Sequence, residues 1–163
     1  MRYESVSGGI PEKYRGQIWC KLFNVNNVSA SHAPCVYAKL LEMPNAEAET
    51  LVPRDINRTM PHFKLWTEDW KSGNNKLFNV LKAYANYDTE VGYVQGLNYI
   101  VALLLFYIPD EESVFWCLIG LMNERNRNWR SIYIDGFPKV KSMSKILEKK
   151  IRYNFPECLR HML

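Results

Sequence analysis

The stretch GYVQGLNYIVALLLFYIP, residues 92–109, decides the fold of this chain of 163 residues. Residues 97–107 are apolar on nearly every side of a helix, which predicts the most buried, central helix of the fold. Pro109 ends this helix, because proline cannot continue one. The longest apolar run, residues 99–108, falls well short of the roughly 20 residues that span a bilayer. Gly92 and Gly96 come just before the helix and indicate a tight turn or the close approach of another chain.

Helical periodicity also dominates the chain on both sides of this stretch. Trp19 and Leu22 are expected to face the core from a first helix that begins at Pro11. A weaker helix is expected over residues 36–42, and residues 29–34 and 44–50 are typical of loops or short connecting helices. An apolar stripe of Leu77, Leu81 and Tyr84 predicts a helix over residues 75–87.

Two more helices are predicted after residue 109. Asp110 is expected to cap the first, with Val114, Phe115, Leu118, Ile119 and Met122 turned inward. Residues 123–130 are polar and irregular, and Pro138 then begins an amphipathic helix that Pro156 ends, with a stripe of Val140, Met143, Leu147 and Ile151. No alternating strand pattern competes. The expected fold class is therefore all-α, with orthogonally packed helices and no sheet.

Composition indicates one globular domain over residues 1–163, since 47% of the residues are hydrophobic and 13% aromatic. A mild net charge of +4 without a run of like charges argues against nucleic-acid binding. The four cysteines are widely spaced, so we expect reduced, mostly packed thiols and no metal site. With no secretory signal at residues 1–10, the expected compartment is the cytosol.

Two stretches carry candidate functional residues. In VPRDINRTMP, residues 52–61, Asp55 precedes Arg58 by three positions, so one helical turn would put both on the same side and let Asp55 aim the guanidinium. The alternative is an ordinary salt bridge near a helix end. In residues 92–98, Gln95 lies at the tip of the turn or the start of the next helix, with its amide free to donate and accept. The alternative is a helix cap.

Together these stretches resemble the TBC domain of Rab GTPase-activating proteins. The family element Ile-x-x-Asp-x-x-Arg reads Val-Pro-Arg-Asp-Ile-Asn-Arg at residues 52–58, and Tyr-x-Gln-Gly reads Tyr-Val-Gln-Gly at residues 93–96. A third element, Gly-Ile-Pro followed by Arg-Gly-x-x-Trp, occupies residues 9–11 and 15–19. The one departure is Val52 in place of isoleucine, a conservative change at an apolar position. Three elements in the family order make the resemblance specific.

The resemblance implies a GTPase-activating protein that accelerates GTP hydrolysis by a Rab-type small GTPase in its GTP form. Arg58 and Gln95 would act in trans as arginine and glutamine fingers, with Asp55, Tyr93 and Gly96 in supporting roles. The chain would then be an activator and not itself an enzyme, with no cofactor of its own, because the partner carries GTP and magnesium. Vesicle trafficking, a cytoplasmic location and indirect contact with endomembranes through the GTPase are also implied. A binding module without catalytic effect is the alternative function.

The same resemblance implies that Arg15 and Trp19 are structural supports. It matches only the earlier part of a TBC domain, so we expect that later helices are absent and that Leu147, Ile151 and Leu159 form an exposed apolar patch prone to self-association. His32, His62 and His161 are expected at the surface or as caps. Cys117 is expected to be a core thiol and not a nucleophile, because no histidine lies near it in sequence.

Overall fold

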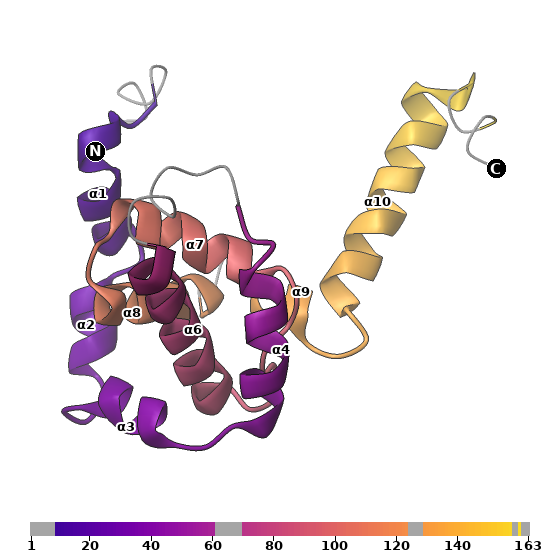
Figure 1. Cartoon of the computed structure of the whole chain (residues 1–163). Helices are drawn as coiled ribbons and strands as arrows, with labels where there is room; N and C mark the ends of the chain where they lie inside the picture. The colour runs from indigo at the N-terminus through magenta and orange to yellow at the C-terminus, as the bar shows by residue number, and fades with distance from the viewer. Residues whose placement is uncertain (1–8, 61–69, 124–128, 158–159, 161–163) are drawn as a thin grey trace.

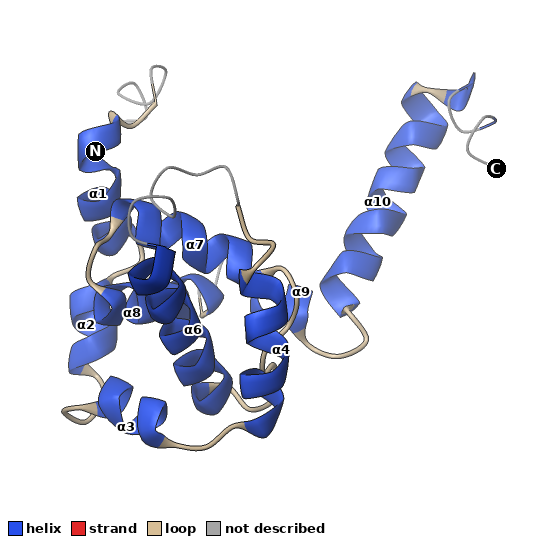
Figure 2. Ribbon diagram, in the orientation of Figure 1, coloured by secondary structure: helices blue, strands red, loops and turns tan. Residues whose placement is uncertain are grey.

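The computed structural model describes residues 9–60, 70–123, 129–157 and 160, and it consists of helices joined by loops (Figure 1). No strand occurs in these described ranges, which confirms the all-α class (Figure 2). In chain order the elements are the 3₁₀ helix η2 (Glu12–Tyr14) and the α-helices α1 (Arg15–Leu22), α2 (Val25–Ala30), α3 (Val36–Glu42), α4 (Ala46–Ile56), α6 (Trp70–Tyr87), α7 (Leu97–Tyr107), α8 (Glu111–Met122), α9 (Arg130–Tyr133) and α10 (Pro138–Asn154).

Local signals set most of the helix ends. α3 and α7 have the predicted bounds. α8 begins where predicted, because the Asp110 carboxylate accepts a hydrogen bond of 2.8 Å from the Ser113 amide. Asn45 starts α4 in the same way, accepting from the Ala48 amide at 2.9 Å, so residues 46–50 open a longer helix. That helix runs through Pro53, and α6 starts at Trp70, before the predicted residue 75.

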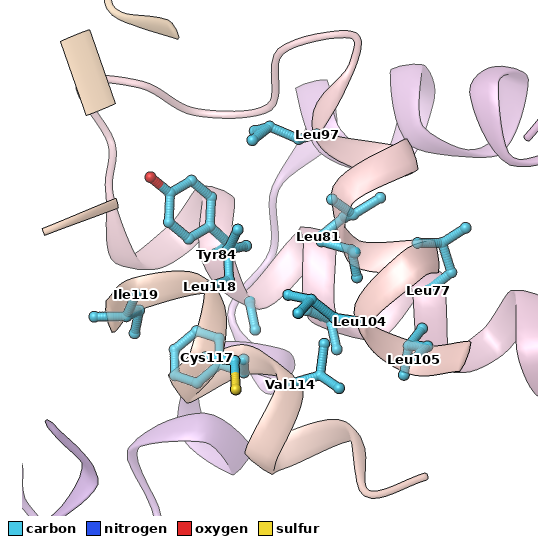
Figure 3. Packing of buried hydrophobic residues seen from close by; sticks show 14 of the residues in the cluster. Leu77, Leu81, Tyr84, Leu97, Leu104, Leu105, Val114, Cys117, Leu118 and Ile119 are labelled. Carbon is cyan, nitrogen blue, oxygen red and sulfur yellow. The ribbon is translucent and has the colours of Figure 1, made fainter. Parts of the chain in front are cut away.

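The core lies between α6, α7 and α8, and α6 makes the most extensive contacts with other helices. It packs against α3, α4, α7 and α8. Figure 3 shows apolar side chains of α6, α7 and α8 pointing toward one another. The predicted stripe of α6 is confirmed, since Leu77, Leu81 and Tyr84 are each at most 1% exposed. The five residues of α8 that were expected to face inward are buried as well.

Two packing predictions were wrong. α7 is not the most buried helix, because the side that carries Tyr99 and Leu103 is open to solvent, with these residues 43% and 40% exposed. Leu22 does not face the core and is 66% exposed. α1 ends at Leu22, and Phe23 takes the inward place, with its carbonyl so close to Gly120 of α8 that a Cβ there would lie 2.2 Å from it.

α10 extends away from the other helices after a loop (Figure 1). It packs against α9, and none of its residues, all of which the structure describes, is buried. Its stripe is therefore largely open to solvent, with Val140, Met143 and Leu147 41%, 54% and 59% exposed. Of the three residues predicted to form an apolar patch near the end of the chain, Leu147 is exposed, Ile151 is partly buried, and Leu159 lies outside the described residues. Among the helices that the structure describes, none has the length and hydropathy to cross a membrane.

Candidate functional site

Arg58 lies just beyond the end of α4, in a turn held by the bond from its own amide to the Asp55 carbonyl, 3.1 Å long. Its side chain turns back to Asp55 as the spacing predicts. Nε and Nη2 both donate to Oδ1 of Asp55, at 3.0 and 2.6 Å. The Arg58 side chain is 59% exposed and that of Asp55 only 10%. The buried carboxylate thus anchors the inner edge of the guanidinium and leaves the outer edge facing solvent.

Tyr93 occupies the second oxygen of the same carboxylate. Its hydroxyl donates to Oδ2 of Asp55 at 2.7 Å in a buried contact. Burial, followed by this bond to Asp55, raises the pKa of Tyr93 above its ordinary value, so the hydroxyl keeps its proton and remains a donor. Because Arg58 holds one oxygen and Tyr93 holds the other, the Asp55 carboxylate cannot rotate without breaking a hydrogen bond. The direction of the Arg58 side chain is therefore fixed through Asp55.

Gln95 lies in the turn that the two glycines form. Gly92 and Gly96 have φ of 60° and 108°, which disfavour any residue with a Cβ, and no described atom lies within 4 Å of where a Cβ would be. Both glycines are thus required by backbone conformation and not by crowding within this chain. Gln95 is exposed, and its amide has no partner among the described residues. The N-cap of α7 is Gly96, so the alternative interpretation of Gln95 as a helix cap is wrong.

The two candidate fingers border one hollow of about 440 Å³. The structure brings together Arg58, Asp55, Tyr93 and Gln95 there, with Gly96 next in the chain. The residues lining the hollow are Leu51, Arg54, Asp55, Arg58, Tyr93 and Gln95. Arg54 was not singled out from the sequence, although it stands one helical turn before Arg58 and therefore on the same face. Two guanidinium groups against one carboxylate leave the hollow with a positive charge, which suits an anionic group of a partner.

Arg15 and Trp19 do not belong to this hollow. Both contact Tyr107 at the far end of α7: Nη1 of Arg15 donates to the Tyr107 hydroxyl at 2.5 Å, and the Trp19 ring meets the Tyr107 ring edge-on at 5.0 Å. Gly16 between them allows the close approach, since a Cβ there would lie 2.1 Å from the Tyr107 carbonyl oxygen. With about 1.5 Å of rise per residue, Tyr107 is roughly 14 Å along α7 from Asn98. These residues join α1 to α7.

A charged cluster that sequence analysis missed holds the start of the Gln95 turn. Arg130 of α9 donates to both oxygens of Asp88, at 2.6 and 2.7 Å, and to Glu90 at 2.5 Å. The Asp88 carbonyl in turn accepts from the Gly92 amide at 2.7 Å. Burial alone would raise the pKa of Asp88, but the bonds and charge of Arg130, together with the bonds from the Val91 amide and the Tyr84 hydroxyl, hold the pKa below its ordinary value. The carboxylate is therefore ionised and ties the turn to α9.

The histidines and Cys117, which the sequence also raised as candidates, form neither a metal site nor a reactive nucleophile in the described part of the chain. Nowhere in it do three or more His, Cys, Asp or Glu side chains gather in a way that could hold a metal ion. His32 caps α2, since its Nδ1 donates to the Val28 carbonyl at 2.7 Å, while His62 and His161 lie outside the described residues. Cys117 is fully buried, and burial raises the pKa of its thiol, which keeps it protonated and unreactive.

Comparison with known proteins shows the family. Residues 12–163 match the family model of the Rab-GTPase-TBC domain, and the chain belongs to this family. It is 33% identical over 162 residues to the GTPase-activating protein GYP5 of Eremothecium gossypii, covering 98% of this chain and 18% of that protein. It is 39% identical to the human Ecotropic viral integration site 5 protein homolog, covering 97% of this chain and 19% of that protein. The Rab GTPase-activating protein tbc-11 of Caenorhabditis elegans is 32% identical, with 98% and 17% covered.

The fold is also that of a solved TBC domain. The crystal structure of the Chlamydomonas flagellar RabGAP TBC domain aligns with a TM-score of 0.70 at 24% sequence identity. The alignment covers 94% of this chain and 49% of that one. This chain therefore spans about half of the solved domain chain and less than a fifth of the curated relatives named above.

Proposed function

We propose that this chain accelerates GTP hydrolysis by a Rab-type small GTPase, supplying Arg58 and Gln95 to the partner's active site. The observation that carries the proposal is the hollow itself: two polar, exposed side chains border it, and the residues that aim them, Asp55 and Tyr93, are buried and hydrogen-bonded. Family membership and the Rab GTPase-activating protein among its relatives support the choice of partner.

Arg58 meets the electrostatic demand of phosphoryl transfer. In the transition state, negative charge spreads over the oxygens of the transferring group, and an arginine supplied in trans accelerates the reaction by about 10³ to 10⁵ in the Ras system. Arg58 can do this because Nε and Nη2 are engaged by Asp55, whereas Nη1 has no partner among the described residues and lies on the exposed side. The guanidinium is aimed before the GTPase arrives, so little conformational entropy is lost on docking.

Gln95 meets the second demand, which is to hold the attacking water in line. A side-chain amide both donates and accepts, so it can bind the water and the γ-phosphoryl group at once. The exposed position of Gln95 on a turn fixed by two glycines suits this role. GTP and magnesium enter with the GTPase, so this chain contributes a cation and an amide and undergoes no chemical change. Its contact with membranes runs through the GTPase.

A single-turnover hydrolysis assay over a panel of Rab proteins tests the proposal. With a matched Rab, the wild-type chain should raise the rate well above the intrinsic one, and Gln95→Ala should be nearly as inactive as Arg58→Ala. Binding of each variant to the Rab, measured separately with a GTP analogue, should stay within a few-fold of wild type. Absence of stimulation across the whole panel, with a folded chain, would refute the proposal.

Replacing the GTPase's own water-orienting glutamine by alanine distinguishes two mechanisms. If Gln95 acts in trans, stimulation largely survives this change, because the activator still holds the water. If the activator supplies only an arginine, stimulation collapses. Two results together would refute the role proposed for Gln95 and leave Arg58 as the single finger. Gln95→Ala would stimulate the unaltered GTPase fully, and the wild-type chain would not stimulate the altered GTPase.

A module that binds a GTPase or another protein without accelerating hydrolysis is the second candidate. The exposed apolar stripe of α10 favours it, since such surfaces are typical of protein interaction sites. A pure binder, however, has no chemical need for both Arg58 and Gln95 at one hollow. Tight binding of a Rab with no change in its hydrolysis rate would establish this second candidate.

A further inference from the structure

The buried polar side chains of the described residues gather at one place. Apart from the tyrosines, Trp116 and Cys117, whose side chains are mostly apolar, the buried polar side chains are those of Asp55, Thr59 and Asn98, which are 7%, 3% and 1% exposed. Asn98 Nδ2 donates to Thr59 Oγ1 at 2.7 Å, and this hydroxyl donates to the Asp55 carbonyl at 2.6 Å. Asn98 Oδ1 accepts from the Gly96 amide at 2.9 Å. One hydrogen-bonded path thus runs from the end of α4 to the Gln95 turn.

This path ends on the peptide that carries Gln95. The Gly96 nitrogen and the Gln95 carbonyl belong to the same planar peptide unit, so a bond to that amide fixes the orientation of the whole unit. On the other side of Gln95, Tyr93 is bonded to the Asp55 carboxylate. Gln95 is therefore flanked by two ties, and both end on Asp55, the residue that also aims Arg58.

We infer that Thr59 and Asn98 are positioning residues, which lock the Gln95–Gly96 peptide to the end of α4 and so fix Gln95 relative to Arg58. The consequence for hydrolysis rests on the proposed function, whereas the lock itself is a property of the free chain. An amide and a hydroxyl in a core are stabilising only when fully paired, and an apolar pair would pack there without that requirement. Paired groups at this point give directional bonds, which apolar contacts cannot give.

The required accuracy explains why such bonds matter here. Groups that act on one transition state must be held to about 0.5 Å, and a displacement of about 1 Å costs roughly 100-fold in rate. Arg58 and Gln95 come from segments 37 positions apart in sequence, and α6 lies between them. Among the described residues, the Tyr93 hydroxyl would be the one hydrogen bond left between the turn and α4 without the path through Asn98, and it does not hold the peptide after Gln95.

The hydroxyl of Thr59 can be tested with variants of matched size. Thr59→Val removes the hydroxyl and keeps the shape, while Thr59→Ser keeps the hydroxyl. With a responsive Rab, Thr59→Val should lower kcat of stimulated hydrolysis by about 100-fold with KM within about twofold of wild type. Thr59→Ser should stay within about threefold of wild type. Thr50→Val is the control, since Thr50 makes the same bond to the carbonyl four residues earlier, at 2.7 Å, on the exposed face of α4.

Equal kcat losses for Thr59→Val and Thr59→Ser, in step with their melting temperatures, would show a merely structural role and overturn the inference. Wild-type kcat for Thr59→Val would overturn it as well. Retention of activity by Thr59→Ser, at a melting temperature no higher than that of Thr59→Val, would support it, because stability alone cannot produce that order.

Amide hydrogen exchange in the free chain tests the lock without any GTPase. Asn98→Ala removes the acceptor for the Gly96 amide, so exchange at Gly96 should become about tenfold faster or more. The Gly92 amide is the internal control, because it lies in the same turn but donates to the Asp88 carbonyl. Thr59→Val should also make exchange at Gly96 faster. It replaces Asn98→Ala in this test if Asn98→Ala does not fold. Unchanged exchange at Gly96 in the folded variant would refute the lock. A chain that stimulates no Rab but shows this exchange pattern would refute the proposed function and leave the lock standing.

Discussion

Arg58→Ala separates a catalytic arginine from a structural one. In the structure, Arg58 is the more exposed partner of its ion pair, and Asp55 keeps a second partner, Tyr93, when the guanidinium is removed. A catalytic role predicts a large loss of activity with a small loss of stability. A structural salt bridge near a helix end predicts the reverse.

The loss of stability and the loss of activity can both be expressed as free energies. An ion pair with one largely exposed partner contributes about 0 to 1 kcal/mol. For a chain of this size that lowers Tm by no more than about 2 to 4 °C. Removing a trans-acting arginine costs about 10³ to 10⁵ in rate, which is roughly 4 to 7 kcal/mol of transition-state stabilisation. The two effects therefore differ at least fourfold in free energy.

Arg152→Ala is the matched control. Arg152 is 63% exposed and bonded to Glu148 at 2.8 Å one turn earlier on α10, far along the chain from the hollow. It should lose as little stability as Arg58→Ala and keep full stimulation. Single-turnover GTP hydrolysis, Rab binding and thermal unfolding are measured on all variants in parallel.

Arg58→Lys sharpens the result. An ammonium cannot donate to Asp55 with one edge and to a phosphoryl group with the other, as the planar guanidinium can, so this variant should fail nearly as badly as Arg58→Ala. Near-normal stimulation by either variant would refute the reasoning. A drop in Tm of more than about 8 °C in Arg58→Ala, with activity falling in proportion, would favour the structural salt bridge.

Three further changes test the surroundings of the hollow and the end of the chain. Gly96→Ala should cost about 1 to 2 kcal/mol in urea unfolding, because its φ of 108° strains any residue with a Cβ, and an unchanged midpoint would contradict the assigned turn. Arg130→Met should destabilise the chain at pH 7 by about 1 to 3 kcal/mol by removing the charged partner of the Asp88 carboxylate. Because the folded-state pKa of Asp88 is lowered, the stability from this pair is present above the unfolded pKa of about 3.9 and is lost as pH falls below it, so the deficit should shrink by pH 3; a deficit independent of pH would refute the assignment. Replacing both Met143 and Leu147 by serine should reduce concentration-dependent association in sedimentation velocity, whereas a wild-type chain that stays monomeric at all concentrations would contradict the predicted self-association.

Sequence predicted the elements whose signals are local. Asp110 before an acidic first turn marked the start of α8, and an apolar run before Pro109 marked α7. The interior of α4 was not predicted, because Pro53 normally indicates a break, yet the helix tolerates it on an exposed side. Leu22 was misplaced for a related reason: periodicity gives the face of a helix but not the residue at which the helix ends.

The contacts at the site also divide into local ones, which the sequence predicted, and distant ones, which it did not. Asp55 and Arg58 are three residues apart, so their contact follows from helix geometry alone, and it was predicted. Asn98 and Thr59 are 39 positions apart, and Arg130 and Asp88 are 42 apart. No periodicity connects such residues, since only the packing of whole helices brings them together. Their side chains are also of types that serve equally well as caps or surface residues.

The hollow joins parts of the chain that must find each other late in folding. Its two ties connect positions 38 and 39 apart, across the full length of α6, whereas the bonds within α4 and α7 form locally. Contacts between distant positions wait for the entropy of closing the intervening loop, so helices precede the site in the order of assembly. On the ribosome, α4 emerges with Arg58 well before residue 98 does, and at about 5 to 20 residues per second a few seconds of synthesis separate the two. A chain interrupted in that interval has its arginine but no counterpart for it.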